Sequence, residues 1–168
     1  MKKIITRNQF RKKTSALAKK MSNDKALIAD AIDLVVKADH YNWLHQTKWF
    51  GEPIINLPQD MFAIQEIIFD TKPDFIIEVG VAWGGSLLFY SSIMESIGGK
   101  AIIGIDIFIP DDLKKRIYSI KKLSKRINLI NGSSTDSKII NKIKKIVGKS
   151  KKVLVILDSD HTHEHVLK

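Results

Sequence analysis

The chain has 168 residues, with 28 Lys and Arg against 18 Asp and Glu, and a formal net charge of +10. Its hydrophobic content of 44% and charged content of 27% suit a single domain with a sizeable core and exclude global disorder. The absence of Cys excludes disulfide frameworks, Cys-ligated zinc or iron–sulfur sites and thiol catalysis. No apolar run is long enough to span a membrane, and Met1–Phe10 lacks the apolar core of a signal peptide, so we expect a cytoplasmic location.

The positive charge is concentrated in three amphipathic stretches, Lys2–Lys20, Lys114–Arg126 and Lys138–Lys152. Apolar residues recur within them at helical spacing, which is more typical of the solvated faces of packed helices than of a nucleic-acid footprint. No signature of a common nucleic-acid-binding module occurs. We therefore expect no nucleic-acid partner, and contact of the basic N-terminus with an anionic membrane surface stays an open alternative.

Residues 1–72 are predicted to form a helical extension. The pattern of residues 1–23 is typical of a basic amphipathic helix or a partly disordered arm. A helix is predicted over Ala26–Ala38, because Asp24 and the two residues before it supply N-cap chemistry. A further helix is predicted over Met61–Asp70, with Asp60 as its cap and Pro58 just ahead of it.

Residues 73–168 change to a pattern of short apolar runs separated by helical segments. The runs are Phe75–Val79, Ala101–Asp106, Ile127–Ile130 and Val153–Asp158, and the helical segments cover about 85–97, 111–125 and 137–147. Apolar runs without polar alternation suit strands of a parallel sheet that is covered on both faces. The predicted class is therefore α/β, with a doubly wound, Rossmann-like parallel sheet of four strands behind the N-terminal helical extension.

A glycine-rich turn follows the first strand, with the order Gly80-Val81-Ala82-Trp83-Gly84-Gly85-Ser86. Glycines there permit positive φ and close approach of a ligand to the backbone, at a helix N-terminus that presents free N–H groups. The spacing differs from the dinucleotide fingerprint, in which a pyrophosphate binds at this position. A tight turn without any ligand is the alternative interpretation.

Two carboxylates flank this turn at the ends of the first two strands. Glu78 closes the first strand, and Asp106 closes the second, 28 positions later. A carboxylate at the second position can accept hydrogen bonds from the two ribose hydroxyls of a nucleoside. Together with the glycine turn, this constellation indicates a site for S-adenosylmethionine, with Glu78 near the amino-acid end of the cofactor.

A third polar cluster, Asp158–His165, follows the fourth strand and therefore lies at the same edge of the predicted sheet. Asp158 and Asp160 can offer oxygen ligands to Mg²⁺, and His161 can act as a general base toward a hydroxyl. A loop or N-cap histidine is the alternative for any single His here. His161, Glu164 and His165 also match the pattern of inverted zinc peptidases, but the third ligand that such a site needs would lie downstream, where little sequence remains.

Several segments in register carry a resemblance to a known family. They are Pro53–Asp60, Gln65–Ile68, Lys72–Gly80, Gly84–Ser86, Gly104–Ile107, Gly132–Asp136 and Leu157–His165. In these segments the sequence resembles the cephalosporin hydroxylase family, which includes rhamnosyl O-methyltransferases, from about Tyr41 to the last residue.

The resemblance implies the class I methyltransferase fold and S-adenosylmethionine-dependent methyl transfer to an oxygen of a small hydroxyl compound such as a sugar, with Mg²⁺ as a probable cofactor. It implies that the cofactor is lined by Glu78, Gly80, Gly84, Gly85 and Ser86, that Asp106 meets its ribose, and that Ser133 and Ser134 border the adenine. It also implies that Asp158 is the first metal ligand and that His161 deprotonates the acceptor.

Family members continue with a further strand whose acidic pair completes the metal site, whereas this sequence stops three residues after His165. The class I sheet has seven strands, of which four can be counted here. We therefore expect a fragment or a natural truncation whose fourth strand has an unpaired edge, which favours a homo-oligomer or marginal stability. A truncated, non-catalytic fragment that binds cofactor or a partner chain stays the alternative function.

Overall fold

The computed structural model describes residues 5–167 and divides the chain into two units, one up to Trp43 and one from Leu44 onward. The sequence pattern predicts a boundary at residue 72 instead. Residues 44–72 group with the sheet because the helix in this segment, α3 (Pro58–Thr71), packs against the first helix after the glycine turn, α4 (Gly85–Ile97).

The first unit consists of two helices, α1 (Arg7–Met21) and α2 (Lys25–Asp39), and part of a short 3₁₀ helix, η1 (Trp43–His45). α1 begins with a capping box, in which the Thr6 side chain accepts a hydrogen bond from the Gln9 amide and the Gln9 side chain accepts one from the Thr6 amide. The Asp24 carboxylate caps α2 by accepting a bond of 3.0 Å from the Leu27 amide, as predicted. No residue of either helix is buried.

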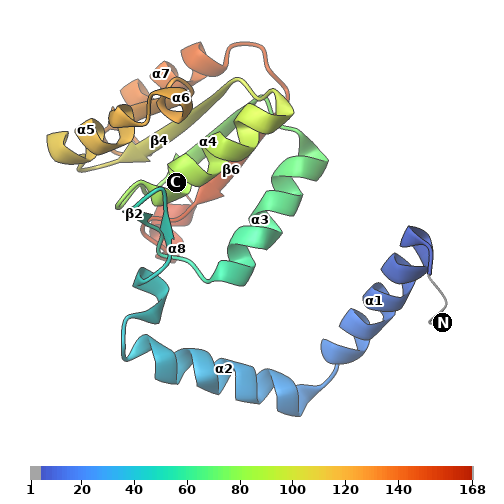
Figure 1. Cartoon of the computed structure of the whole chain (residues 1–168). Coiled ribbons are helices and arrows are strands. Elements are labelled where there is room, and N and C mark those ends of the chain that lie inside the picture. Colours follow the sequence, from blue (N-terminus) through green and yellow to red (C-terminus); the bar gives the residue numbers. More distant parts are fainter. Residues whose placement is uncertain (1–4, 168) are drawn as a thin grey trace. The chain divides into compact units, whose positions relative to one another are not determined.

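The second unit is built on a parallel sheet of four strands in the order β5–β4–β3–β6 (Figure 1). The strands are β3 (Phe75–Val79), β4 (Ala101–Asp106), β5 (Ile127–Asn131) and β6 (Val153–Leu157). All four predicted strands are confirmed, and the order places their carboxyl ends at one edge of the sheet. The α/β, Rossmann-like class is confirmed as well.

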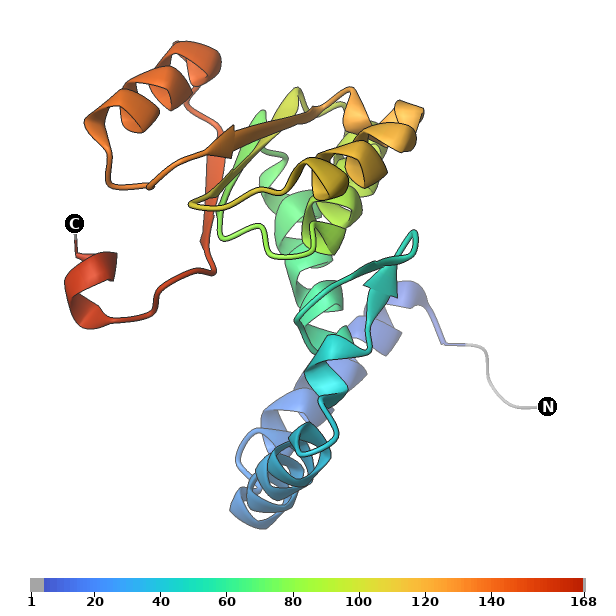
Figure 2. The ribbon, with the colours of Figure 1, turned by 90° about the vertical axis from the view of Figure 1, so that its left-hand side faces the viewer.

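Helices cover both faces of this sheet, and Figure 2 shows α7 (Ser137–Val147) on the opposite side from α4. On one face, α3, α4, α5 (Asp111–Ser119) and α6 (Lys121–Ser124) bury a large core that includes Ile68, Leu88 and Ile117. On the other face, α7 packs Ile139 and Ile143 against a smaller cluster around Ile103. α4 and α7 have the predicted bounds, whereas the single helix predicted over about 111–125 is interrupted at Ile120, whose ψ of 72° is not helical.

A two-stranded antiparallel hairpin, β1 (Lys48–Trp49) with β2 (Glu52–Pro53), leads into α3. The predicted start of α3 is wrong by one turn's length: the helix begins at Pro58 rather than Met61, with Leu57 as the N-cap, and Asp60 lies in its first turn. Proline is favoured at the first helical position because its missing N–H would have no helical partner there. The hairpin lies against the N-terminus of α4 and so contributes to one wall of the site.

Candidate functional site

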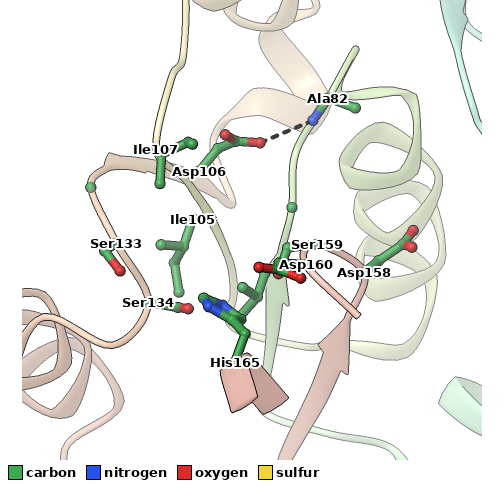
Figure 3. A pocket seen from close by; sticks show the side chains of 13 residues that line it. Ala82, Ile105, Asp106, Ile107, Ser133, Ser134, Asp158, Ser159, Asp160 and His165 are labelled. Atoms are coloured by element: carbon green, nitrogen blue, oxygen red, sulfur yellow. Dashed lines mark hydrogen bonds between the residues drawn. The ribbon is translucent and has the colours of Figure 1, made fainter. Parts of the chain in front are cut away.

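The carboxyl ends of the four parallel strands surround a cavity of about 470 Å³ (Figure 3). Each strand contributes residues at or just after its end: Val79, Gly80 and Ala82 from β3; Ile105, Asp106 and Ile107 from β4; Gly132, Ser133 and Ser134 from β5; and Asp158, Ser159, Asp160 and His165 from β6. Residues far apart in the sequence meet here because parallel strands end at a shared edge.

Asp106 fixes the glycine turn to the end of β4. Its Oδ2 accepts hydrogen bonds from the amides of Val81 at 2.8 Å and Ala82 at 3.3 Å, and its Oδ1 accepts one from Phe108 at 3.1 Å (Figure 3 marks the Ala82 bond). An ionised carboxylate has about four acceptor positions, so Oδ1 keeps capacity for a further donor such as a hydroxyl. Asp106 thus organises the turn and also lines the cavity.

Gly80 is required by the packing of the turn. Its φ is +100°, and a Cβ at this position would lie 1.9 Å from the carbonyl oxygen of Asp158. The backbone segments that follow β3 and β6 therefore touch at a point where only glycine fits. This close approach holds two walls of the cavity in a fixed relation.

Gly84 and Gly85 are explained by contacts within the protein. A Cβ on Gly84 would meet the side chains of Ile117 and Leu113 in α5, and one on Gly85 would lie 2.4 Å from the carbonyl oxygen of Pro53. These two glycines let α4 approach α5 and the β1–β2 hairpin, and neither lines either cavity described here.

Glu78 lies beneath the site rather than on its surface. The side chain is 1% exposed, and the Ser86 hydroxyl donates a bond of 2.8 Å to its Oε2. Burial raises the pKa of Glu78 to about 8, against the opposing effect of hydrogen bonds from Ser86 and Tyr90. The buried Glu78 carboxyl therefore holds the end of the glycine turn in place through its hydrogen bond with Ser86.

A second, smaller cavity of about 140 Å³ adjoins the first and shares Gly80, Ala82, Asp158 and Ser159 with it. Its other walls are the segment Pro53–Asn56, the residues Val81, Trp83 and Ser86 of the glycine turn and α4, and His161. The His161 Nε2 lies 3.6 Å from the Asp158 Oδ1. An imidazole beside a carboxylate is thus present next to the larger cavity.

A sequence model of the rhamnosyl O-methyltransferase/CmcI family matches residues 41–168. The chain belongs to this family. The match confirms the resemblance seen in the sequence, and it covers the whole second unit and the last three residues of the first.

Two curated relatives and two solved structures illustrate the likeness. The chain is 27% identical over 139 residues to the rhamnosyl O-methyltransferase of Mycobacterium tuberculosis (strain H37Rv), and this match covers 79% of the chain and 55% of that protein. It is 29% identical over 141 residues to the rhamnosyl O-methyltransferase of Mycobacterium leprae, and this match covers 79% of the chain and 58% of that protein. An apo structure of CmcI matches with a TM-score of 0.54 at 21% sequence identity and covers 71% of this chain and 48% of that one. A structure of CmcI with Mg and SAM matches with a TM-score of 0.54 at 19% sequence identity and covers 73% of this chain and 50% of that one. The chain therefore spans about half the length of these relatives.

Within this family member, most of the predicted site residues come together. Gly80, Asp106, Ser133, Ser134 and Asp158 line the larger cavity, and Ser86 and His161 line the smaller one. Glu78, Gly84 and Gly85 line neither, because they are engaged in the contacts beneath and beside the turn.

Ser159 and His165 also line the larger cavity and were not predicted as cofactor residues. Asp160, which the sequence indicates only as an oxygen ligand for a cation, lines the same cavity. A hydrogen bond from the Thr162 backbone amide is the main cause that lowers the pKa of Asp160, so this carboxylate stays ionised at neutral pH. The sequence does indicate that Ser159, Asp160 and His165 could line the site, because they follow the fourth strand and so lie at the same edge of the sheet as Gly80.

A metal site would need several ligands to converge, and Asp158 is the ligand that the sequence predicts. Figure 3 shows the Asp158 carboxylate directed away from Asp160 and His165. Among residues 5–167, no three His, Asp or Glu side chains come together as a group that can hold a metal ion. The zinc-peptidase alternative also loses its geometric basis, because α8 (His163–Val166) begins after His161, so His161 and His165 do not share a helical turn.

Proposed function

We propose that this chain is the cofactor-binding part of an S-adenosylmethionine-dependent O-methyltransferase that acts on a small hydroxyl compound such as a sugar. The membership of the family supports the reaction class, and two relatives are named rhamnosyl O-methyltransferases. The observation that carries the proposal is the cavity at the carboxyl edge of the sheet, in which Gly80, Asp106 and Asp158 meet.

The larger cavity suits the donor in size and charge. Its volume of about 470 Å³ lies in the range of small-molecule and cofactor sites, roughly 300–1,000 Å³. Three acidic residues, Asp106, Asp158 and Asp160, line it, in a chain whose net charge is strongly positive. An acidic lining favours a ligand that carries a sulfonium and an ammonium group. We assign Asp106 to the ribose hydroxyls, and Ser133 and Ser134 to the adenine side.

The smaller cavity is the proposed place of the acceptor hydroxyl. Bound S-adenosylmethionine supplies a methyl group on a positively charged sulfur, and its transfer breaks the S–C bond as an O–C bond to the acceptor forms. His161 takes the proton that the acceptor oxygen loses, and Asp158 orients the imidazole. Trp83, 52% exposed at the same cavity, covers the approach from solvent. The protein's main contribution is to hold the two reactants in line.

Mg²⁺ belongs to this proposal with Asp158 as its first ligand. A solved CmcI structure with Mg and SAM supports the choice of ion, and oxygen ligands are those that Mg²⁺ prefers. Because the described residues hold no group of three ligands, no catalytic step is assigned to the ion here.

Isothermal calorimetry with S-adenosylmethionine tests the donor site. The wild type is expected to bind, and Asp106→Ala to bind at least about tenfold more weakly, because bonds to a charged acceptor are lost. Asp111→Ala removes an exposed carboxylate that pairs with Lys114 on the same helix and should leave the affinity unchanged. No binding by the wild type, or equal affinities of wild type and Asp106→Ala, would reject the proposal.

The second candidate function is a non-catalytic cofactor-binding or interaction chain. The exposed apolar residues of β6, Val155 and Leu157, favour contact with another chain. A methyl-transfer assay on sugar acceptors, with and without Mg²⁺, separates the two functions: binding of the donor without turnover favours the second, whereas turnover by a monomer favours the first.

A further inference from the structure

The three basic stretches of the chain differ in what their apolar residues do. In α5 and α6, Leu113, Ile117 and Leu123 are buried in the main core, so the cations around them form a solvated face. In α7, Ile139, Ile143 and Ile146 are partly buried against the second face of the sheet. These two stretches confirm the interpretation of packed helices with solvated faces, whereas every residue of α1 is exposed.

The apolar residues of α1 form one stripe along the helix. Phe10, Leu17 and Met21 are separated by seven and four positions, which at 3.6 residues per turn places them within a narrow sector. Their exposed fractions are 56%, 53% and 59%. From Phe10 to Met21, the stripe covers most of α1 (Arg7–Met21).

Cations border this stripe, and the helix contains no acidic residue. The six basic residues are Arg7, Arg11, Lys12, Lys13, Lys19 and Lys20. By helical geometry, Arg7 and Arg11 flank one edge of the stripe, and Lys13 and Lys20 flank the other. The sequence from Leu44 onward also contains more Lys and Arg than Asp and Glu.

We propose that α1 is an interfacial helix that binds the surface of an anionic phospholipid bilayer, with Phe10, Leu17 and Met21 inserted among the acyl chains and the cations at the headgroups. An apolar stripe bordered by basic residues is the pattern of helices that lie in the membrane plane. A nucleic acid would be met by the cations alone and would give the exposed stripe no apolar partner. Within residues 5–167, no helix has the length and apolar character to cross a bilayer. No residue of α1 lines either cavity of the proposed methyl-transfer site.

Co-sedimentation of the full chain with vesicles tests the proposal. We expect binding to vesicles of equal parts phosphatidylcholine and phosphatidylglycerol, little binding to phosphatidylcholine alone, and release at high salt. Replacing Lys13 and Lys20 by Gln should weaken binding about fivefold for each cation removed. Leu17→Gln should weaken it as well, whereas the matched Ala16→Gln, outside the stripe, should not. Circular dichroism of each variant checks that the helix persists.

Three results would overturn the proposal. Equal binding to neutral and anionic vesicles, or none to either, would remove the electrostatic basis. If the chain binds duplex DNA or RNA more tightly than anionic vesicles, and Leu17→Gln does not change this binding, the partner of the helix is a nucleic acid. If the chain self-associates without lipid, and Leu17→Gln abolishes this self-association, a second copy of the chain covers the stripe. Because none of the substituted residues lines either cavity, loss of vesicle binding with retained binding of S-adenosylmethionine separates this proposal from the proposed function.

Discussion

The backbone of Gly80 lies against the backbone of Asp158, so closely that a Cβ on Gly80 would lie 1.9 Å from the Asp158 carbonyl oxygen. This contact joins the segment after β3 to the segment after β6, and both segments line the two cavities of the site. Rigidity of the site therefore depends on a residue without a side chain.

Gly80→Ala should reduce both stability and binding of S-adenosylmethionine. The positive φ of a non-glycine residue costs about 1–2 kcal/mol, and the clash with backbone atoms adds to this cost because those atoms have little freedom to move. Gly98→Ala is the matched control, since Gly98 has a φ of +79° but no atom within 4 Å of an added Cβ. Thermal unfolding should show a larger loss for Gly80→Ala, and equal losses would contradict the backbone contact.

Glu78 should make the stability of the fold depend on pH. Burial raises its pKa to about 8 from an ordinary value of 4.5. Between these two values the unfolded chain releases the proton and the folded chain keeps it, so the free energy of unfolding falls as the pH rises through this window. Below pH 4.5 the carboxyl is protonated in both states, and the contribution to stability is fully present.

Thermal unfolding of wild type and Glu78→Gln between pH 5 and about 8 measures this effect. The variant should lose less stability than the wild type as the pH rises. Glu95→Gln is the control, because the hydrogen bond from Arg126 lowers the pKa of Glu95. Its contribution is lost only at pH values below this range, so its pH profile should run parallel to that of the wild type. Parallel pH profiles for wild type and Glu78→Gln would show that Glu78 titrates normally.

The sequence predicts the strands and two of the helices closely for identifiable reasons. α4 lies between Gly84 and Gly98, both with positive φ, and such glycines mark helix ends in the sequence. The four apolar runs have no polar alternation, as strands covered on both faces require. α3 was placed too late because Asp60 looks like a cap, although Pro58 already fits the first position of a helix.

The site was predicted less completely than the fold. Gly80, Asp106 and Asp158 follow from the shared edge of a parallel sheet. The sequence does not show which glycines of the turn face the cavity, and Gly84 and Gly85 prove to be packed against α5 and the hairpin. Nor does it show that Glu78 points into the core, since an acidic residue closing a strand can point to either side.

His161→Gln should reduce methyl transfer to a sugar acceptor by about a hundredfold or more, which is the usual contribution of a general base, while the affinity for S-adenosylmethionine stays unchanged. The reason is that His161 lines the smaller, acceptor-side cavity and not the larger one. His163→Gln is the matched control, because His163 lines neither cavity. Unchanged turnover of His161→Gln would assign the deprotonation of the acceptor to another group.

The strand β6 lies at an edge of the described sheet, and two of its apolar residues are uncovered. Val155 and Leu157 are paired in register with Ile77 and Val79, so they share the face on which α7 packs, yet they are 52% and 54% exposed. An unpaired strand edge next to exposed apolar surface favours association with another chain. We therefore predict that a homo-oligomer, if formed, uses this face.

Light scattering over a range of protein concentrations should therefore show self-association of the wild type, and Val155→Lys should shift it to higher concentration. Lysine on an edge strand opposes pairing by its charge and by its need for solvation. Phe69→Lys adds the same charge on α3 at a side chain that is also 52% exposed, so it separates the effect of the β6 face from that of net charge. If the two variants associate alike, or if the wild type stays monomeric throughout, this face is not the contact surface, because a lysine in the contact would have to be buried without a partner.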